Sequence, residues 1–467
     1  MAVAAAAATT DGTVMAGASL SRWTMSYFAA ALFFLLVGNG LFVVGFGYPA
    51  MPIEAPETLI LVHILAIGWL GLLFSGALLQ FVPVLVAKPL YAPGLAPVAL
   101  ILLITGLLCL VFGFMYIADY LEGGVAFLPF GGLLLAAGFG LVISMIGGTL
   151  LTGRPLGVPA RFVATGIVAL VATLFLGVCF TLTLSGFTSA PFLDQLLVSG
   201  VSLHVFLGLV GWMSVSTFGV SYQLLTMFLL VHEKGRWRTH AISGLMTTSV
   251  LMAVIAIPAV ASGWNPAMPV YAAISIFVSA SCLFIYEVVT IYRQRKRPSL
   301  ELNMKMNAVA TGALFLSVCL FFLLAMNGSL ASHVGPLTYM VALNWLSVLG
   351  LGHLYKIVAF MTWLESYGPI LGRKPVPRVQ DLVNEKRASI WFFLYAGCTA
   401  VSIFALLLEM SSAFRAVSLV QMVCLTVVIV ELARTRRLSY VSMSPSSDGK
   451  GAHAAPPLFL PTQFERK

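Results

Sequence analysis

The chain has 467 residues, of which 60% are hydrophobic and only 9% are charged, and its mean hydropathy is +1.01. Soluble domains carry about 25% charged residues, so this composition excludes an ordinary soluble enzyme. It predicts an all-α integral membrane protein whose main partner is the lipid bilayer. The net charge of +9 could suggest nucleic-acid binding, but the cations are confined to loops between apolar runs. They therefore predict membrane topology and no nucleic-acid partner.

Twelve apolar runs reach the length of about 20 residues that a membrane-spanning helix needs. The predicted spans are 23–47, 58–86, 93–117, 125–151, 161–186, 194–230, 240–262, 269–292, 306–328, 335–364, 388–410 and 412–433. Residues 1–22 are expected to be a disordered lead and 438–467 a disordered tail. The residues between them, 23–437, form one twelve-helix transmembrane domain.

Charge alternates between successive loops. One set of loops carries Lys88, Arg154, Arg161, Lys234, Arg236, Arg238, Arg293, Arg295, Lys296, Arg297, Lys305, Arg373, Lys374, Arg378, Lys386, Arg387, Arg434, Arg436 and Arg437. The other set carries Glu54, Glu57, Asp119, Glu122, Asp194 and Glu409, with Arg415 as its one basic residue. Basic loops stay in the cytoplasm, so both termini are expected inside a bacterial inner membrane. The basic loop 365–387 is interpreted either as an ordered cap on that side or as a plain tether.

One sequence pattern recurs three times inside long apolar runs. Its copies are Trp69-x6-Gly76-x3-Gln80, Trp212-x6-Gly219-x3-Gln223 and Trp345-x6-Gly352-x3-Lys356. At about 100° per residue, these spacings put the three marked positions of each copy on one helix face. The copies fall in the second, sixth and tenth spans. Equal spacing by four spans predicts three parallel four-helix pseudo-repeats, at about 23–151, 161–292 and 306–433, with the marked helices innermost.

Polar side chains gather toward the cytoplasmic ends of these marked helices. The predicted deep polar cluster consists of Gln80, Tyr222, Gln223, His353, Tyr355 and Lys356. A buried lysine needs a partner or a shifted pKa, and the acids nearest by sequence are Glu365 and Glu287. Two interpretations remain open for this cluster: a path for protons or ions from the cytoplasm, or a hydrogen-bonded lock between helices.

Two histidines lie at similar depth in the outer third of marked helices. His63 precedes Trp69 by six residues and His204 precedes Trp212 by eight. Imidazole is the commonest protein ligand of haem iron, copper and zinc, so both are candidate haem or metal ligands. The alternative is a structural role within the helix packing. Small residues follow His204 on its own face, at positions 208 and 211; they leave room for a flat group such as a porphyrin, or they allow close helix packing.

The second span reads His63-ILAIGWLGLLFSGALLQFV-Pro83. With twelve spans in three parallel units, it resembles helix two of haem-copper oxidase subunit I, where the low-spin haem histidine precedes a Gly-rich stretch and a proline. Nitric-oxide reductases share that fold, and the NnrS family of haem-containing membrane proteins linked to nitric-oxide metabolism has a similar outline. The resemblance implies that His63 is an axial haem ligand. The chain contains no CxxCH motif, so any haem is expected to be non-covalent.

This sequence lacks several of the metal-ligand histidines of that family, which limits the functions that can be expected of it. The oxidases place a copper histidine on helix six, which His204 could match, but the His-His pair of helix seven and the haem histidines of helix ten have no counterparts in this sequence. Oxygen reduction is therefore not expected. The leading hypothesis is a haem-binding protein that handles nitric oxide or electrons, or supports a respiratory complex, with electron-donor or respiratory-chain proteins as partners. The alternatives are a transporter or channel lined by the polar cluster, and a copper-handling protein that uses His63, His204 and Met213.

Overall fold

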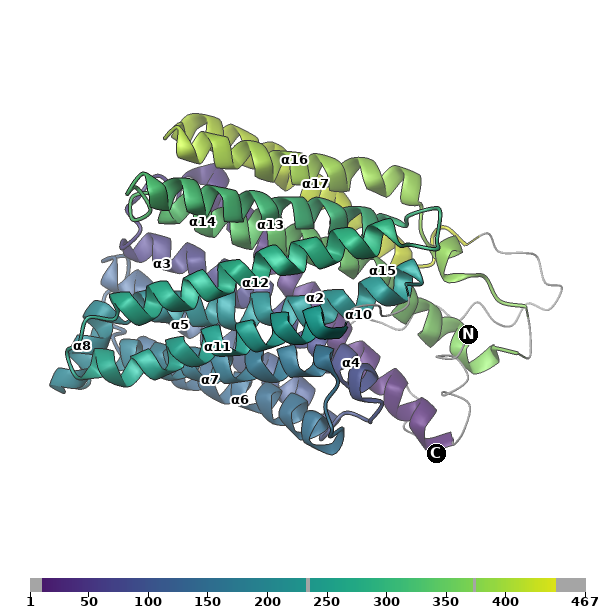
Figure 1. Ribbon diagram of the computed structural model, residues 1–467, viewed down its shortest axis with the longest axis horizontal. Helices are drawn as coiled ribbons and strands as arrows, with labels where there is room; N and C mark the ends of the chain where they lie inside the picture. The colour runs from purple at the N-terminus through teal and green to yellow at the C-terminus, as the bar shows by residue number, and fades with distance from the viewer. Residues whose placement is uncertain (1–10, 232–235, 373–374, 442–467) are drawn as a thin grey trace.

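The computed structural model describes residues 11–231, 236–372 and 375–441. All regular structure in these three ranges is helical, and twelve of the helices are long and apolar enough to cross a membrane. The prediction of an all-α protein with twelve spans is therefore confirmed. Figure 1 shows the helices running roughly side by side as one elongated bundle.

The helices follow one another in three sets of four spans. The first set consists of α2 (Asp11–Val44), α3 (Pro56–His63) with η1 (Ile64–Gly71) and α4 (Leu72–Val86), η2 (Pro93–Leu95) with α5 (Ala96–Ile117), and α6 (Phe127–Thr152). The second consists of α7 (Val158–Leu184), the short α8 (Pro191–Ser199), α9 (Val201–Val205) with η3 (Phe206–Ser214) and α10 (Val215–Leu229), α11 (Arg236–Ala261) and α12 (Ala267–Arg293). The third consists of α13 (Leu302–Met326), α14 (Val334–Tyr339) with η4 (Met340–Ser347) and α15 (Val348–Tyr367), the short η5 (Gly368–Ile370) and η6 (Val379–Leu382), α16 (Glu385–Leu407) and α17 (Ser411–Arg436).

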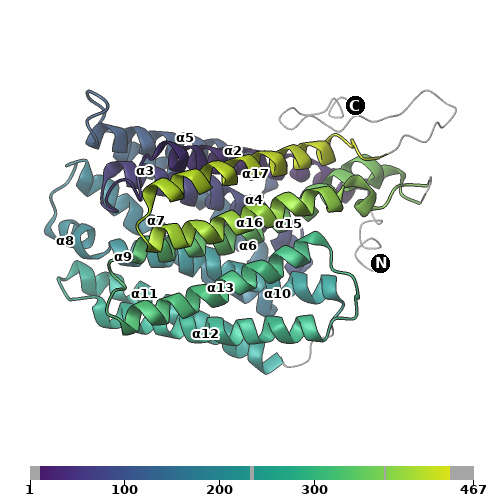
Figure 2. The same cartoon turned by 90° about the horizontal axis from the view of Figure 1, so that it is seen from above.

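Helix α2 begins and α17 ends at the same end of the bundle (Figures 1 and 2). The described loops and helix ends there carry Lys88, Arg154, Lys296, Arg297 and Arg437, and we call it the basic end. The opposite end carries Glu54, Glu57, Asp119, Glu122, Asp194 and Glu409, and we call it the acidic end. An even number of crossings brings the two chain ends to one side, as the alternation of charge predicts.

The second, sixth and tenth spans are the most enclosed. Their most apolar 18-residue windows are 67%, 67% and 61% buried, against 33–50% for the other nine. The three chain-adjacent helix pairs α5–α6, α11–α12 and α16–α17 pack along each other more extensively than other pairs do. Each pair comprises the third and fourth spans of its set, so the same neighbours recur in all three sets.

Close approach between α5 and α6 depends on glycine. A Cβ added at Gly131 would lie 2.7 Å from the backbone N of Leu110, and one added at Gly106 would lie 2.8 Å from the backbone N of Leu135. No side chain fits at either distance. Lipid tails are as apolar as leucine, so helices in a bilayer associate through close packing of this kind.

Three boundaries differ from the sequence-based expectation. Helix α2 begins at Asp11, within the stretch that was expected to be a disordered lead. The predicted run 194–230 is broken at Gly200, where α8 has ended. At the other end of the chain, Tyr440 donates a hydrogen bond to the Glu431 carboxylate, so the expected tail does not start at 438. The remaining parts of the lead and the tail, 1–10 and 442–467, lie outside the described residues.

Candidate functional site

Each of the three enclosed spans contains one π-helical segment at the same place. The segments are η1, η3 and η4, and they contain Trp69, Trp212 and Trp345 respectively. A π-helical turn is rare, and in membrane and soluble helices alike it often marks a functional position. Sequence periodicity at 100° per residue gives no signal for it, so these segments were not predicted.

The three tryptophans contact one another's helices in a ring. The indole Nε1 of Trp69 donates to Ser347 Oγ at 2.7 Å. The ring of Trp212 lies 6.3 Å from that of Phe74, in the span of Trp69. The ring of Trp345 lies 5.6 Å from that of Phe218, in the span of Trp212. Each tryptophan therefore reaches the next marked span in the same cyclic order.

His63 is the last residue of α3, directly before the π-helical segment η1. Its Nδ1 lies 2.7 Å from the backbone O of Leu59, and its ring lies 5.3 Å from the ring of Phe114 on α5. The side chain is half-buried. A hydrogen bond from Nδ1–H to a carbonyl fixes the tautomer and leaves the Nε2 lone pair for a ligand.

His204 repeats this arrangement on α9. Its Nδ1 lies 3.1 Å from the backbone O of Thr173, and its ring packs 5.4 Å from that of Phe180 and over Gly177, all on α7. It is half-buried, and it lies within electrostatic range of His63. Among the residues that the structure describes, none forms a hydrogen bond with Nε2 of either imidazole. The sixth span thus provides a second imidazole within electrostatic range of the one on the second span.

The small residues after His204 pack tightly and leave no space for a flat group. A Cβ added at Gly211 would lie 2.7 Å from Cβ of Ala169, and one added at Gly208 would lie 3.3 Å from Cγ2 of Thr173. Both glycines therefore face α7 and allow close packing. The alternative interpretation, room for a porphyrin beside them, is wrong for this face of the helix.

The third enclosed span has a tyrosine at the place of His63. Tyr339 precedes Trp345 by six residues and directly precedes η4. Its hydroxyl donates to Oε1 of the fully buried Gln421 at 3.1 Å. The third span therefore provides a hydrogen-bonded phenol at this level, where the first provides an imidazole.

The predicted polar cluster is distributed over separate contacts. Gln80 donates to Thr24 Oγ1 at 2.7 Å, at the interface between α4 and α2. His353 Nε2 lies 3.4 Å from Asn307 Nδ2 on α13. Tyr222 lies within electrostatic range of Arg238, and Gln223 is half-buried on α10. Tyr355 and Lys356 border a common cavity with Glu301, and the path interpretation for the six side chains stays a prediction.

Lys356 is paired with an acid that sequence proximity did not suggest. Its Nζ lies 2.7 Å from Oε2 of Glu301, the residue that precedes α13. The two expected partners are bound elsewhere: Glu287 to Arg238 and Glu365 to Arg436, each at 2.5 Å. The two acids nearest in sequence are not the partners, because α13 packs along α15. The first turn of α13 therefore lies beside Lys356, although it is more than 50 residues away in the sequence.

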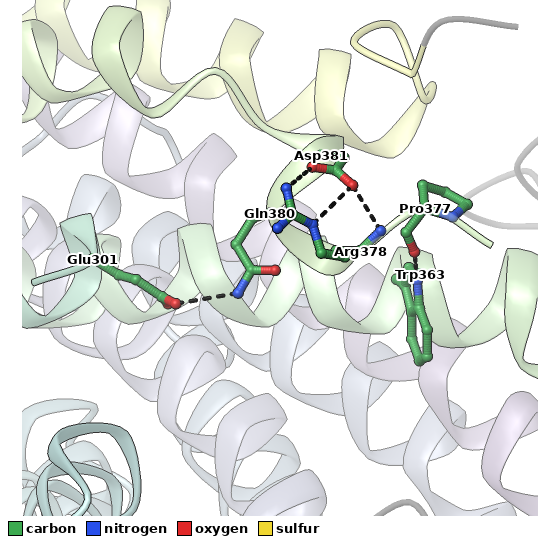
Figure 3. A network of polar contacts seen from close by, with 6 residues as sticks. All are labelled: Glu301, Trp363, Pro377, Arg378, Gln380 and Asp381. Atoms are coloured by element: carbon green, nitrogen blue, oxygen red, sulfur yellow. Dashed lines mark hydrogen bonds and ion pairs between the residues drawn. The ribbon is translucent and has the colours of Figure 1, made fainter. Parts of the chain in front are cut away.

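The loop after α15 is an ordered cap in the part that the structure describes. Figure 3 shows Trp363 donating to the backbone O of Pro377 and Gln380 reaching down to Glu301, at 2.6 and 3.3 Å. The side chains of Arg378 and Asp381 are hydrogen-bonded to each other at the start of the short helix η6. The cap interpretation is confirmed, and we call residues 377–383 the cap segment. Glu301, Asn303 and Asn307, which lie beneath it, were not identified from the sequence.

His63 and His204 are the two metal-ligand candidates that the sequence predicted in the outer part of the marked spans. Within the described ranges, no group of three or more His, Cys, Asp or Glu side chains could hold a metal ion. A copper ion at this place would have two imidazoles and no third strong ligand. Two axial imidazoles are, in contrast, sufficient for haem iron, whose other four ligands come from the porphyrin. Comparison with known proteins finds no family model that matches the chain and no curated protein significantly similar to it.

Proposed function

We propose that this chain is a haem-binding membrane protein built from three parallel four-helix units, as in haem-copper oxidase subunit I. Three observations support the repeat: the equal placement of the π-helical segments, the cyclic contacts of their tryptophans, and the recurring helix pairs. They agree with the sequence spacing, which is independent of the packing.

The observation that carries the haem proposal is the pair His63 and His204. Each imidazole has its Nδ1 engaged by a backbone carbonyl, at 2.7 and 3.1 Å, and each leaves Nε2 without a protein partner in the described part of the chain. This is the state in which imidazole binds iron, because the carbonyl fixes the ring and raises its basicity. When bound, haem supplies an iron centre for electron transfer or for binding nitric oxide.

The proposed pair differs from the oxidase arrangement in its second ligand. The oxidases carry haem histidines on helix ten, whereas the partner of His63 here comes from the sixth span and the tenth presents Tyr339. We therefore propose electron handling, nitric-oxide handling or support of a respiratory complex in the bacterial inner membrane, and not oxygen reduction.

The test is an absorption spectrum of the detergent-purified protein, as isolated and after dithionite reduction. We expect a Soret band and visible bands that sharpen on reduction, as bis-imidazole haem gives. His63→Ala and His204→Ala are each expected to lose or shift them. His333→Ala is the matched control, because His333 is also half-buried and bonds a carbonyl four residues back, Ser329 O at 2.9 Å, but precedes α14 and lies outside the marked span.

Two results would reject the proposal. One is a purified protein with no Soret band that also gains none when haem is added. The other is a band that survives both His63→Ala and His204→Ala unchanged. Metal analysis of the same preparation separates haem iron from copper, the second metal that two imidazoles bind well.

A further inference from the structure

A cavity of about 20 Å³ lies at the basic end, far along the bundle from the two histidines. The start of α13, the middle of α15 and the cap segment enclose it. Its polar lining consists of Glu301, Asn303, Tyr355, Lys356, Gln380 and Glu385. A water needs roughly 10–15 Å³ measured in this way, so the cavity has room for one or two waters.

The lining contains buried polar atoms that no protein group satisfies. Asn303 is 2% exposed, and neither its Oδ1 nor its Nδ2 has a hydrogen-bond partner in the described chain. Tyr355 is 4% exposed, and its hydroxyl is likewise unpartnered among those residues. Buried polar groups without protein partners are normally satisfied by ordered water. The lining therefore offers both hydrogen-bond donors and acceptors. A water can bond to both kinds of group, whereas a simple ion can bond to only one of them.

The charges around the cavity are balanced. Glu301 accepts from Lys356 at 2.7 Å and from Arg297 at 2.6 Å, and Glu385 lies 3.5 Å from Lys305. The further titratable groups that act on Tyr355 are Glu431 and Tyr440. With cations and carboxylates facing each other in this way, a bound cation or anion would meet a like charge, whereas a neutral water would not.

Beyond the cavity, a second buried asparagine leads to His353. Asn307 follows Asn303 by one turn of α13, and His353 precedes Lys356 by one turn of α15. Asn307 is 2% exposed and His353 is 9% exposed. The Asn307 amide lies 3.4 Å from His353 Nε2, and neither residue is among those that line the cavity.

We propose that this cavity is a hydrated proton-exchange site, closed toward the solvent by Gln380 and toward the membrane interior by Asn307, through which His353 exchanges protons with the cytoplasm. Exchange requires a water from the cavity to pass Asn307 and reach the ring, where it gives one proton to the imidazole and takes one from it, so the ring keeps its charge. Gln380 controls access because its bond to Glu301 holds the cap segment over the cavity. The site lies at the opposite end from His63 and His204 and does not depend on haem.

The experiment follows the N–H of His353 in the full-length protein in lipid nanodiscs by 15N NMR after transfer to D2O, with His353→Gln assigning the signal. Asn303→Leu replaces the polar amide by a larger apolar side chain, which displaces water from the cavity, and is expected to slow exchange by about tenfold or more. Gln380→Ala loosens the cap segment and is expected to speed it. Gln80→Leu is the matched control, since Gln80 has in the first copy of the tryptophan pattern the position that Lys356 has in the third, and it donates to Thr24 away from the cavity.

Exchange that is unchanged by Asn303→Leu, or slowed equally by Gln80→Leu, would overturn the proposal. Asn303→Ser retains a hydrogen-bonding group and should keep exchange within about twofold of the original protein; it serves as the test if the leucine variant does not fold. A high-resolution structure offers a second readout, because waters on Asn303 and Tyr355 are expected and a dry cavity would refute the site.

Discussion

The ion pair between Arg436 and Glu365 gives the sharpest test of how the basic end is held together. It joins the end of α17 to the end of α15, with Nη2 and Oε2 2.5 Å apart, and the two side chains are 7% and 5% exposed. Arg436 also donates to Thr362 Oγ1 at 3.3 Å. Solvent screens this pair little, so its geometry decides the energy.

Removing one partner leaves the other charge buried, which costs about 3–5 kcal/mol. We therefore expect Arg436→Met to lower the free energy of unfolding by about that amount, and Glu365→Leu to do the same. The double variant replaces both charges by apolar groups and is expected to recover most of the loss, because neither charge is then buried alone.

The assay is SDS-induced unfolding of the purified protein, read as a double-mutant cycle. Arg434→Met is the matched control, because Arg434 pairs with Glu431 on the same helix at 3.1 Å but is 37% exposed; screening limits its expected cost to under about 1 kcal/mol. A double variant that loses the full sum of the single losses would refute the reasoning, as would a control that loses as much as Arg436→Met.

Two further predictions concern the cap and the ring of tryptophans. Burial alone would raise the pKa of the Glu301 carboxyl, but the hydrogen bonds and charges of Lys356, Gln380 and Arg297 outweigh it and hold the pKa below its usual 4.5. Because its pKa is lowered, the ionised Glu301 carboxylate stabilises the folded cap above pH 4.5, and this stabilisation is lost as the pH falls through the folded value. Hydrogen exchange of residues 377–383, corrected for intrinsic rates, should therefore be constant from pH 7 to about 5 and rise below 4.5. Constant protection down to pH 3 would contradict this. Ser347→Ala leaves the buried Trp69 N–H without its hydrogen-bond acceptor and should lower the free energy of unfolding by about 1–3 kcal/mol. Ser347→Thr keeps the hydroxyl and should lower it less. Equal losses for the two variants would show that the bond is unimportant.

The sequence predicted what depends on composition and on spacing along one helix. The twelve spans follow from apolar length, and the depth of His63 and His204 follows from their distance to Trp69 and Trp212. The structure places these two imidazoles within electrostatic range of each other, as similar depth on marked helices suggested.

What the sequence could not predict depends on which helices are neighbours. Lys356 has its acid on α13, and no local pattern distinguishes Glu301 from Glu365 as its partner. The glycines at 208 and 211 face α7 at close range, although small residues on a helix face are equally compatible with an open space. The unsatisfied amide of Asn303 becomes visible only when its surroundings are known.

The π-helical segments divide each enclosed span into two halves whose registers are independent. One residue can be inserted or deleted within η1, and the widened turn absorbs the change by becoming larger or reverting to an ordinary turn. The half that carries Gln80 would stay in place while the half that carries His63 rotates about its axis. Single-residue length changes at these three places are therefore a route by which related chains can turn a different side chain toward the interior of the bundle near its acidic end, without repacking the half near its basic end.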